Sequence, residues 1–352
     1  MKRLARMDGL RGILAVYVLL GHALPFTCLP GWVTAPFRHG EAAVDLFFAL
    51  SGLVIANSLE RFGWQFVPFM AARARRLLPV YFLVLAVSIC LTTLGDPLQA
   101  MPWVGGEGRN IMAAALPRPL LPHLLAHLTL VHGLIPQSAL PYAYVTLLGP
   151  AWSLSTEWQF YVLIGLIAPH RLGKFALALL ALGAAYRALP LGAEFSRAFL
   201  PDAAPFFALG LASAVLLRGG RSRSFWLCLL GACALALPVG VEKLFTPLAW
   251  GLVMLAQRQS WGAVLEGRAV QYLGAVSYPL YLVNEPVQRA MALLLGPVAH
   301  GGAVWFTAAF LPLSIGLSLL CAAWLHNTVE RPLMRQQNDR MSFGVIAATG
   351  RE

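Results

Sequence analysis

Long apolar runs follow one another along this chain, and they constrain its fold more than any other feature of the sequence. An α-helix of about 20 apolar residues is long enough to cross the hydrocarbon core of a bilayer, which is ~30 Å thick. Glycines, prolines and charge clusters separate the runs from one another. The pattern predicts ten spans, at residues 9–27, 42–59, 77–95, 151–168, 174–190, 200–217, 224–239, 242–257, 268–293 and 303–326.

The composition supports a membrane location. Hydrophobic residues make up 59% of the 352 residues and charged residues only 12%, against about 25% charged residues in soluble domains. We therefore expect an all-α integral membrane protein, a polytopic bundle of transmembrane helices. Because a bundle in lipid does not meet the size limit of a soluble core, one transmembrane domain over residues 1–335 is the simplest organisation, followed by a cytoplasmic tail at 336–352.

The basic residues predict the orientation of the chain. Its formal net charge is +11, but 19 of the 26 Lys and Arg residues fall on one side of the ten-span arrangement. Cytoplasmic loops carry an excess of such residues, so both termini are expected in the cytoplasm, and nucleic-acid binding is not. The long exterior connection after the third run contains an apolar stretch, 120–134, that we interpret as an interfacial or re-entrant helix.

Several common chemistries have no counterpart in the sequence. The five cysteines show no CxxC spacing and are interpreted as buried hydrophobic residues. His123, His127 and His132 are not accompanied by an HExxH glutamate, so we expect no metal site and no permanently bound cofactor. Motifs for nucleotide hydrolysis, dinucleotide binding and serine hydrolysis are missing. The basic N-terminus precedes a run without a cleavage site, which predicts a retained first helix.

The first apolar run carries two polar side chains, Arg11 and His22, eleven residues apart. Eleven helical residues turn about 1,100°, roughly 20° past three full turns, so both side chains share one face about 16 Å apart. Ionisable groups at membrane depth are costly and usually face a polar interior, which indicates a functional site. The alternative is structural, with Arg11 as an anchor at the membrane surface and His22 as a hydrogen-bonded residue inside the bundle.

Three arginines, Arg73, Arg75 and Arg76, precede the third run at its cytoplasmic end. An orientation signal alone would need fewer cations, although that remains the alternative interpretation. Guanidinium groups bind phosphates through several hydrogen bonds at once. The cluster therefore predicts binding of a phosphorylated donor from the cytosol.

Carboxylates occur within two further runs. Asp45 lies near the outer end of the second run, which also contains Ser51 and Gly52. Ser51 is predicted to line a pocket at membrane depth, and the alternative is that both small residues only let helices approach closely. Glu157 lies about one turn into the fourth run, where an unpaired carboxylate would cost several kcal/mol or become protonated. We expect a partner for it on the first helix, Arg11 or His22, either in a functional site or in a structural ion pair.

More polar residues of the fourth and ninth runs are candidates for the same pocket. Trp152, Ser153 and Tyr161 flank the carboxylate of the fourth run, and Tyr281 and Asn284 belong to a polar stripe interrupted by prolines. Broken helices are tolerated at membrane depth where they line a cavity. These five side chains are therefore predicted to line a pocket, although the tyrosines could equally form an aromatic belt.

Together these motifs resemble the membrane-bound acyltransferase-3 family, the O-acyltransferases of bacterial surface polysaccharides. The similar stretches keep the order of the family along the whole chain: Asp8 to Arg11 with His22, Asp45 to Gly52, Arg73 and Arg76 before Leu77 and Pro79, Trp152 to Ser155 with Glu157 and Tyr161, and Ser277 to Leu282. The resemblance implies about ten transmembrane helices, an acyl-CoA donor (most simply acetyl-CoA), a carbohydrate or glycan-lipid acceptor, and a multi-pass location in the bacterial inner membrane, among membrane lipids. Family members usually carry His at the position of Asn284, and an amide keeps a hydrogen-bonding role there but cannot titrate.

These residues lead to a hypothesis of acyl transfer from acyl-CoA to a carbohydrate hydroxyl. His22 would act as general base on the hydroxyl, or take the acyl group itself, with Asp45 or Glu157 holding its tautomer. Arg11 would hold the donor or neutralise Glu157, and the arginine cluster would bind the phosphates of CoA. The pantetheine arm is of the same order as the ~16 Å between Arg11 and His22. The alternative is a transporter or flippase of an acyl or glycan-lipid substrate.

Overall fold

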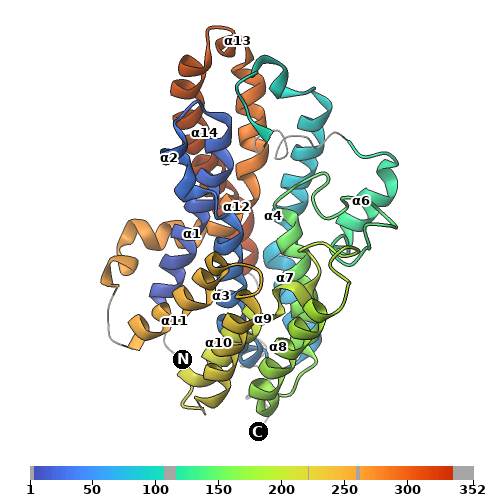
Figure 1. The fold of residues 1–352 in the computed structure, drawn as a ribbon, viewed down its shortest axis with the longest axis vertical. Helices are drawn as coiled ribbons and strands as arrows, with labels where there is room; N and C mark the ends of the chain where they lie inside the picture. Colours follow the sequence, from blue (N-terminus) through green and yellow to red (C-terminus); the bar gives the residue numbers. More distant parts are fainter. Residues whose placement is uncertain (1–3, 107–115, 221, 259–261, 336–352) are drawn as a thin grey trace.

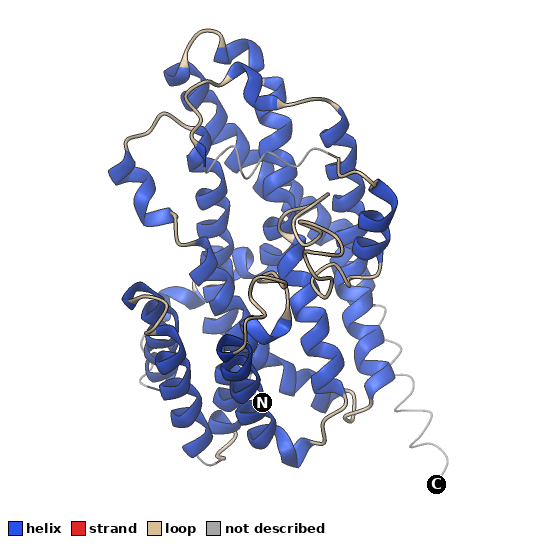
Figure 2. Ribbon diagram, turned by 45° about the vertical axis from the view of Figure 1, so that its right-hand side comes forward, coloured by secondary structure: helices blue, strands red, loops and turns tan. Residues whose placement is uncertain are grey.

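The computed structural model describes residues 4–106, 116–220, 222–258 and 262–335, and its regular elements in these ranges are all helical (Figures 1 and 2). The predicted all-α class is confirmed. The predicted tail, 336–352, lies outside the described residues. Each predicted span coincides with one helix, in the order α1 (Ala5–Ala23), α3 (Gly40–Arg61), α4 (Phe66–Thr93), α7 (Ala151–Gly165), α8 (Leu172–Ala188), α9 (Leu200–Leu217), α10 (Arg223–Ala236), α11 (Phe245–Arg258), α12 (Arg268–Leu294) and α14 (Ala303–Leu325).

Helix length distinguishes certain spans from the others. Within the described ranges, five helical segments are long and apolar enough to cross a membrane, namely those that contain α1, α3, α4, α9 and α14. The α7 helix has only 15 residues, or about 22 Å of rise, and the segment with α8 continues from it at an angle of 114°. If this bent pair counts as one span, the number is six. Ten crossings therefore stay a prediction.

Short helical pieces connect the long helices. Within the stretch 120–134, interpreted as an interfacial or re-entrant helix, the structure has α6, which has nine residues and is too short for a crossing. Its place relative to the membrane stays a prediction. The other short elements are η1 (Leu24–Phe26), α2 (Gly31–Thr34), η2 (Ala35–Phe37), η3 (Pro97–Ala100), α6 (Leu120–Leu128), η4 (Pro169–Arg171), η5 (Val241–Leu244), η6 (Ala263–Glu266), α13 (Gly296–Ala299) and the π-helix η7 (His326–Glu330).

Glycines set the spacing of two helix pairs, α1 with α12 and α3 with α9. A Cβ atom at Gly12 would lie 2.5 Å from the backbone nitrogen of Gly274, and one at Gly52 would lie 2.5 Å from the carbonyl oxygen of Phe207. A Cβ atom at Gly210 would overlap the backbone of α3. Small residues allow such close approach of helices in membranes, as predicted for Gly52.

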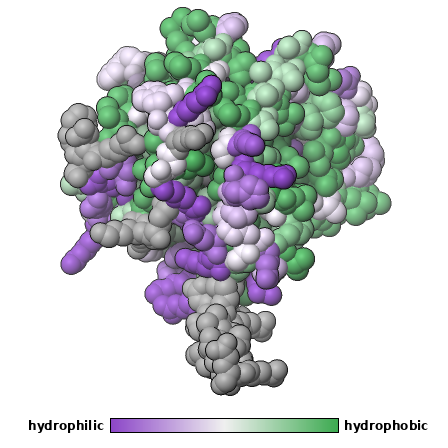
Figure 3. Space-filling view, turned by 90° about the horizontal axis from the view of Figure 1, so that it is seen from below, coloured by the Kyte–Doolittle hydropathy of each residue, from purple (hydrophilic) through white to green (hydrophobic). Residues whose placement is uncertain are grey.

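The ion pairs at the two ends of the bundle agree with the predicted sides of the membrane. Residues predicted to be cytoplasmic pair with each other, as do residues predicted to be exterior: Arg6–Glu266, Arg76–Glu330 and Arg218–Glu60 at one end, and Arg197–Asp45, Arg197–Glu41 and Lys243–Glu41 at the other. Seen from below, hydrophilic side chains gather over the end of the molecule where α1 begins, beside a largely apolar surface (Figure 3). The structure thus separates the two ends, and which end faces the cytoplasm stays a prediction.

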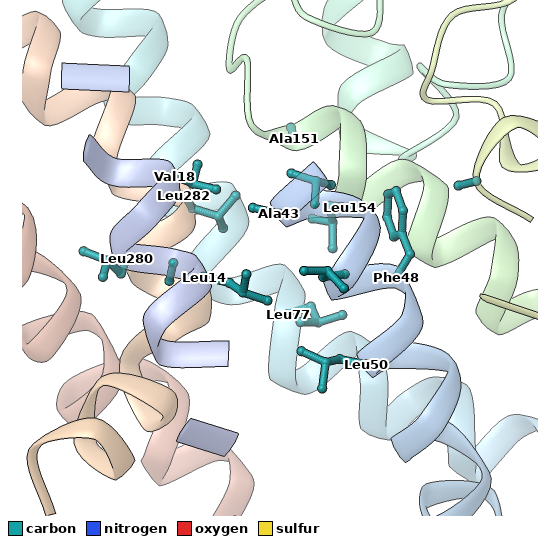
Figure 4. Close-up of a cluster of buried hydrophobic side chains, with 14 of the residues drawn as sticks. Leu14, Val18, Ala43, Phe48, Leu50, Leu77, Ala151, Leu154, Leu280 and Leu282 are labelled. Atoms are coloured by element: carbon teal, nitrogen blue, oxygen red, sulfur yellow. The ribbon is translucent and has the colours of Figure 1, made fainter. Parts of the chain in front are cut away.

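Buried apolar side chains fill the space where five helices meet. Figure 4 shows part of this cluster, with Leu14 and Val18 from α1, Ala43, Phe48 and Leu50 from α3, Leu77 from α4, Ala151 and Leu154 from α7, and Leu280 and Leu282 from α12. Phe48, Leu77, Leu154 and Leu282 also form walls of a polar cavity. The same packing that stabilises the bundle therefore fixes the helices that carry the candidate site.

Candidate active site

A cavity lies among α1, α3, α4, α7 and α12, with about 70 Å³ of space for the centres of water molecules. Its charged lining consists of three arginines and one carboxylate, Arg11, Arg73, Arg76 and Glu157. This excess of cations in a site with apolar walls favours anions. Most pocket residues predicted from separate runs meet here, because Ser51, Ser153, Tyr161 and Tyr281 also line the cavity.

Glu157 is held by hydroxyl groups from two helices. One of its oxygens, Oε1, accepts hydrogen bonds from Ser51 on α3 and from Tyr161 on its own helix, one turn further along. Arg11 and Arg73 interact electrostatically with the same carboxylate. Of the two partners predicted for Glu157, the structure therefore brings it together with Arg11.

The arginine cluster divides into cavity residues and a surface residue. Arg73 donates to the hydroxyl of Ser58, and its guanidinium lies 5.7 Å from the ring centre of Phe69 and 5.4 Å from that of Tyr161. Arg76 is also in the cavity lining, three residues further along the same face of α4. Arg75 points elsewhere and is exposed, because one residue of an α-helix turns by about 100°. Arg75, which was predicted to contact the donor, therefore does not line the cavity.

The imidazole of His22 is oriented by Asn284 of α12. Nδ1 of His22 lies 2.8 Å from Oδ1 of Asn284. The amide nitrogen of Asn284 donates to the carbonyl oxygens of Tyr281, at 2.5 Å, and Leu280, at 3.4 Å. The amide oxygen must therefore accept from Nδ1–H, and Nε2 carries the lone pair of the neutral ring. The group at Nδ1 of His22 is thus Asn284, and not Asp45 or Glu157, the two residues predicted to hold its tautomer.

The His22–Asn284 pair lies just beyond the cavity. Neither residue is part of its lining, but Tyr281, one turn before Asn284 on α12, is, and it accepts a hydrogen bond of 3.0 Å from Ser153. The arginine end of the cavity is near Tyr278, whose hydroxyl donates to the carbonyl oxygen of Leu77 at 2.7 Å. The six residues from Tyr278 to Asn284 rise by about 9 Å. The candidate base is therefore displaced from the arginines along α12.

Asp45 belongs to an ion-pair network at the other end of the bundle. Arg197, in the connection before α9, contacts Asp45 at 2.9 Å and Glu41 at 3.0 Å, and its guanidinium lies 5.3 Å from the ring centre of Trp152. Burial opposes the charge of Arg197, but the carboxylates of Asp45 and Glu41 raise its pKa. Asp45 and Trp152 are thus near neighbours of the site without lining the cavity. Arg197 was not predicted, because a lone arginine in a loop carries no periodic signal.

The three histidines of the connection between α4 and α7 are engaged in structural contacts. The rings of His127 and His132 stack with their centres 4.1 Å apart, and each ring donates to or accepts from a neighbouring group. His123 lies 2.9 Å from the hydroxyl of Thr146. In the part of the chain that the structure describes, no group of His, Cys, Asp and Glu side chains could hold a metal ion. Burial lowers the pKa of His132 to about 4 and that of His127 well below its ordinary value.

Comparison with known proteins agrees with this geometry. A family model described as an acyltransferase domain matches residues 4–323. The chain belongs to the acyltransferase-3 family. The family predicted from the motifs is thereby confirmed, and the helices of membrane-spanning length identify this member as a membrane protein. No solved structure matches the chain.

Several relatives of this acyltransferase-3 chain have names that state a function. It is 26% identical to "Acyltransferase MdmB" of Streptomyces mycarofaciens, over 84% of this chain and 81% of that protein. It is 27% identical to "Exopolysaccharide production protein ExoZ" of Rhizobium meliloti (strain 1021), over 90% of this chain and 96% of that protein. A shorter match, 37% identical, is to "Protein 2 in picA locus" of Rhizobium radiobacter, and it covers 27% of this chain and about half, 51%, of that protein.

Proposed function

We propose that this chain transfers an acyl group, most simply acetyl, from acyl-CoA to a hydroxyl of a cell-surface or lipid-linked carbohydrate in the bacterial inner membrane. The observation that carries the proposal is the arginine-lined cavity that ends one helical turn from the His22–Asn284 pair. The names of two relatives, an acyltransferase and an exopolysaccharide production protein, support an acyl transfer and a polysaccharide acceptor.

The arginines of the cavity are the groups suited to the donor. Coenzyme A carries a pyrophosphate and a 3′-phosphate, and guanidinium groups bind such oxygens through paired, charge-assisted hydrogen bonds. Arg11, Arg73 and Arg76 converge on one space with a single carboxylate, Glu157, so the lining has the charge that an anionic donor needs. The hydrophobic side chains of the lining, among them Phe47 and Phe48, are suited to an acyl group.

The chemistry then depends on the lone pair at Nε2 of His22. As the acceptor oxygen attacks the thioester carbonyl, Nε2 takes the proton of the hydroxyl, and the C–S bond breaks to release the thiolate of CoA. The thiolate takes up the proton, so the products are an O-acyl carbohydrate and CoA. Asn284 keeps Nδ1 protonated throughout, since its amide oxygen only accepts. Transient acylation of His22 itself is the second route, in which Nε2 is the nucleophile.

Purified protein in lipid nanodiscs with radiolabelled acetyl-CoA provides the test. The acceptor is surface polysaccharide from cells that lack this chain, and transfer is followed as label in the polysaccharide and as released CoA. His22→Ala should abolish transfer while the protein still inserts and elutes as a single species. His39→Ala, which changes an exposed histidine, is the matched control and should retain activity. Transfer by His22→Ala would refute the base, and passage of substrate without chemistry would favour a transporter or flippase.

A further inference from the structure

The last long helix ends in a π-helical turn, His326–Glu330, that directs a carboxylate into the protein. π-helical turns are rare and occur frequently at functional sites, because the extra residue in the turn redirects the side chains that follow. Glu330 is only 2% exposed, although its neighbours Asn327, Thr328 and Arg331 are exposed. A carboxylate buried in this way is costly unless it is paired. The turn therefore has a specific target inside the bundle.

That target is an arginine of the candidate active site. Oε1 of Glu330 lies 3.5 Å from Nε of Arg76, and Oε2 lies 2.8 Å from Nδ1 of His326, one residue of the same turn. Both oxygens of the carboxylate are thus used. Arg76 is one of the three arginines that line the cavity, whereas Glu330 is not part of the lining, so Glu330 contacts the site through Arg76.

The geometry of this contact leaves the binding part of the guanidinium available. Glu330 meets Arg76 at Nε, the nitrogen nearest to the chain, in an ion pair of 3.5 Å that is too long for a hydrogen bond, and this contact does not involve the two terminal nitrogens. Arg73 is anchored in another way, by Ser58 and by the rings of Phe69 and Tyr161. Arg76 has no such anchor of its own. It is also repelled by the neighbouring cations Arg11 and Arg73, which would drive an untethered side chain away from the cavity.

We propose that Glu330 is a positioning residue for donor binding: it holds Arg76 by Nε so that both terminal nitrogens face the phosphate oxygens of the donor. The inference rests on the proposed function, because the phosphates are those of acyl-CoA. Holding a flexible cation in its binding geometry before the ligand arrives reduces the entropy that binding must overcome. Glu330 would therefore affect donor affinity rather than the chemical step.

Direct binding of CoA, together with acetyl-transfer kinetics, tests the inference on the full chain in nanodiscs. Glu330→Gln should weaken CoA binding about tenfold and raise the KM for acetyl-CoA in parallel, while kcat changes less than about twofold. Arg76→Gln should do the same. The double variant should bind no worse than Arg76→Gln alone, because Glu330 has nothing left to position. A merely structural role would instead give additive losses and a lower melting temperature.

Control variants separate the possible outcomes. Glu266→Gln removes another ion pair at the same end, 2.7 Å from Arg6 and away from the cavity, and should leave CoA affinity unchanged. Glu330→Asp keeps the charge but shortens the reach, so it should fall between wild type and Glu330→Gln, and it decides the matter if Glu330→Gln does not insert. Unchanged CoA affinity in both Glu330 variants, or additive losses in the double variant, would overturn the inference alone. Failure of wild-type protein to bind CoA would overturn the acyl-CoA donor and this inference with it.

Discussion

Asn284 holds an amide where members of the family usually carry a histidine, and the structure shows what an amide can do there. Its oxygen accepts from Nδ1 of His22 at 2.8 Å, and its nitrogen is fixed by two carbonyl groups of α12. Asn284→Ala should lower kcat for acetyl transfer by roughly 100-fold, because the imidazole loses its orientation and its preferred tautomer. The KM for acetyl-CoA should stay the same, since the arginines are untouched.

Steady-state kinetics with saturating acceptor measure this effect. Asn284→His, which restores the usual residue of the family, should keep more activity than Asn284→Ala, because a ring nitrogen can also accept from Nδ1–H. Asn327→Ala changes an exposed amide of the π-helical turn and serves as control. If Asn284→Ala retained the kcat of wild type, His22 would not need this partner.

At the residue scale, the sequence predicted which residues belong to the site better than it predicted which side chains contact each other. The first apolar run placed Arg11 and His22 on one helix, as observed, and the motifs identified Ser51, Glu157 and Tyr161, which meet in the structure. Periodicity says nothing about which helix packs against a given face. The partner of His22 and the surface position of Arg75 therefore emerged only from the packing of α12 and α4.

The contact of α3 with α9 leads to a prediction about stability. Gly210 faces the backbone of α3 so closely that an added Cβ atom would overlap it. Gly210→Ala should therefore destabilise the fold by about 1–3 kcal/mol, the usual cost of overpacking. Gly316→Ala is the matched control on α14, since a Cβ atom there meets nothing within 4 Å. Melting temperatures in detergent measure both, and an equal effect of the two variants would contradict the packing role.

The stacked histidines near α6 predict how stability depends on pH. Burial lowers the pKa of His132 to about 4 in the folded state, from an ordinary value of 6.5. The unfolded chain therefore binds a proton that the folded chain rejects, and stability is complete above pH 6.5 and falls as the pH drops toward 4. His132→Gln should reduce this fall, because glutamine does not titrate. Melting temperatures between pH 7 and pH 4.5 test it, and a variant with the slope of wild type would assign the pH dependence to other groups.

At the scale of elements, hydrophobic run length predicted every long helix but not its exact limits or its path. The sequence predicted separate spans at 151–168 and 174–190, and the structure ends the first of them earlier, at Gly165, with a bend before Pro169. Residues before proline disfavour the helical conformation, which explains the break, but the angle of 114° follows from packing. The π-helical turn at His326 leaves no periodic trace at all, because a single inserted residue is within the uncertainty of a helix boundary.

For the whole molecule, the asymmetry of the basic residues predicted two separate ends, and the ion pairs agree with that separation. Arg6 and Arg218 pair with carboxylates at one end, and Arg197 and Lys243 at the other. This arrangement requires α8 to connect the two ends, although it has only 17 residues, or about 25 Å of rise. The number of crossings thus depends most directly on α8.

Labelling of single cysteines with a membrane-impermeant maleimide tests whether α8 crosses. In a chain whose five native cysteines are replaced by serine, Arg171→Cys and Ala193→Cys place a thiol at exposed positions just before and just after this helix. If α8 spans the membrane with both termini in the cytoplasm, the exterior reagent should label Ala193→Cys in cells with intact inner membranes and reach Arg171→Cys only after lysis. Labelling of both positions from one side would make α7 and α8 a re-entrant pair. In that case α7, which carries Glu157, would enter and leave the membrane on the same side. The route by which a cytosolic donor reaches the arginines of the cavity would then have to be derived again.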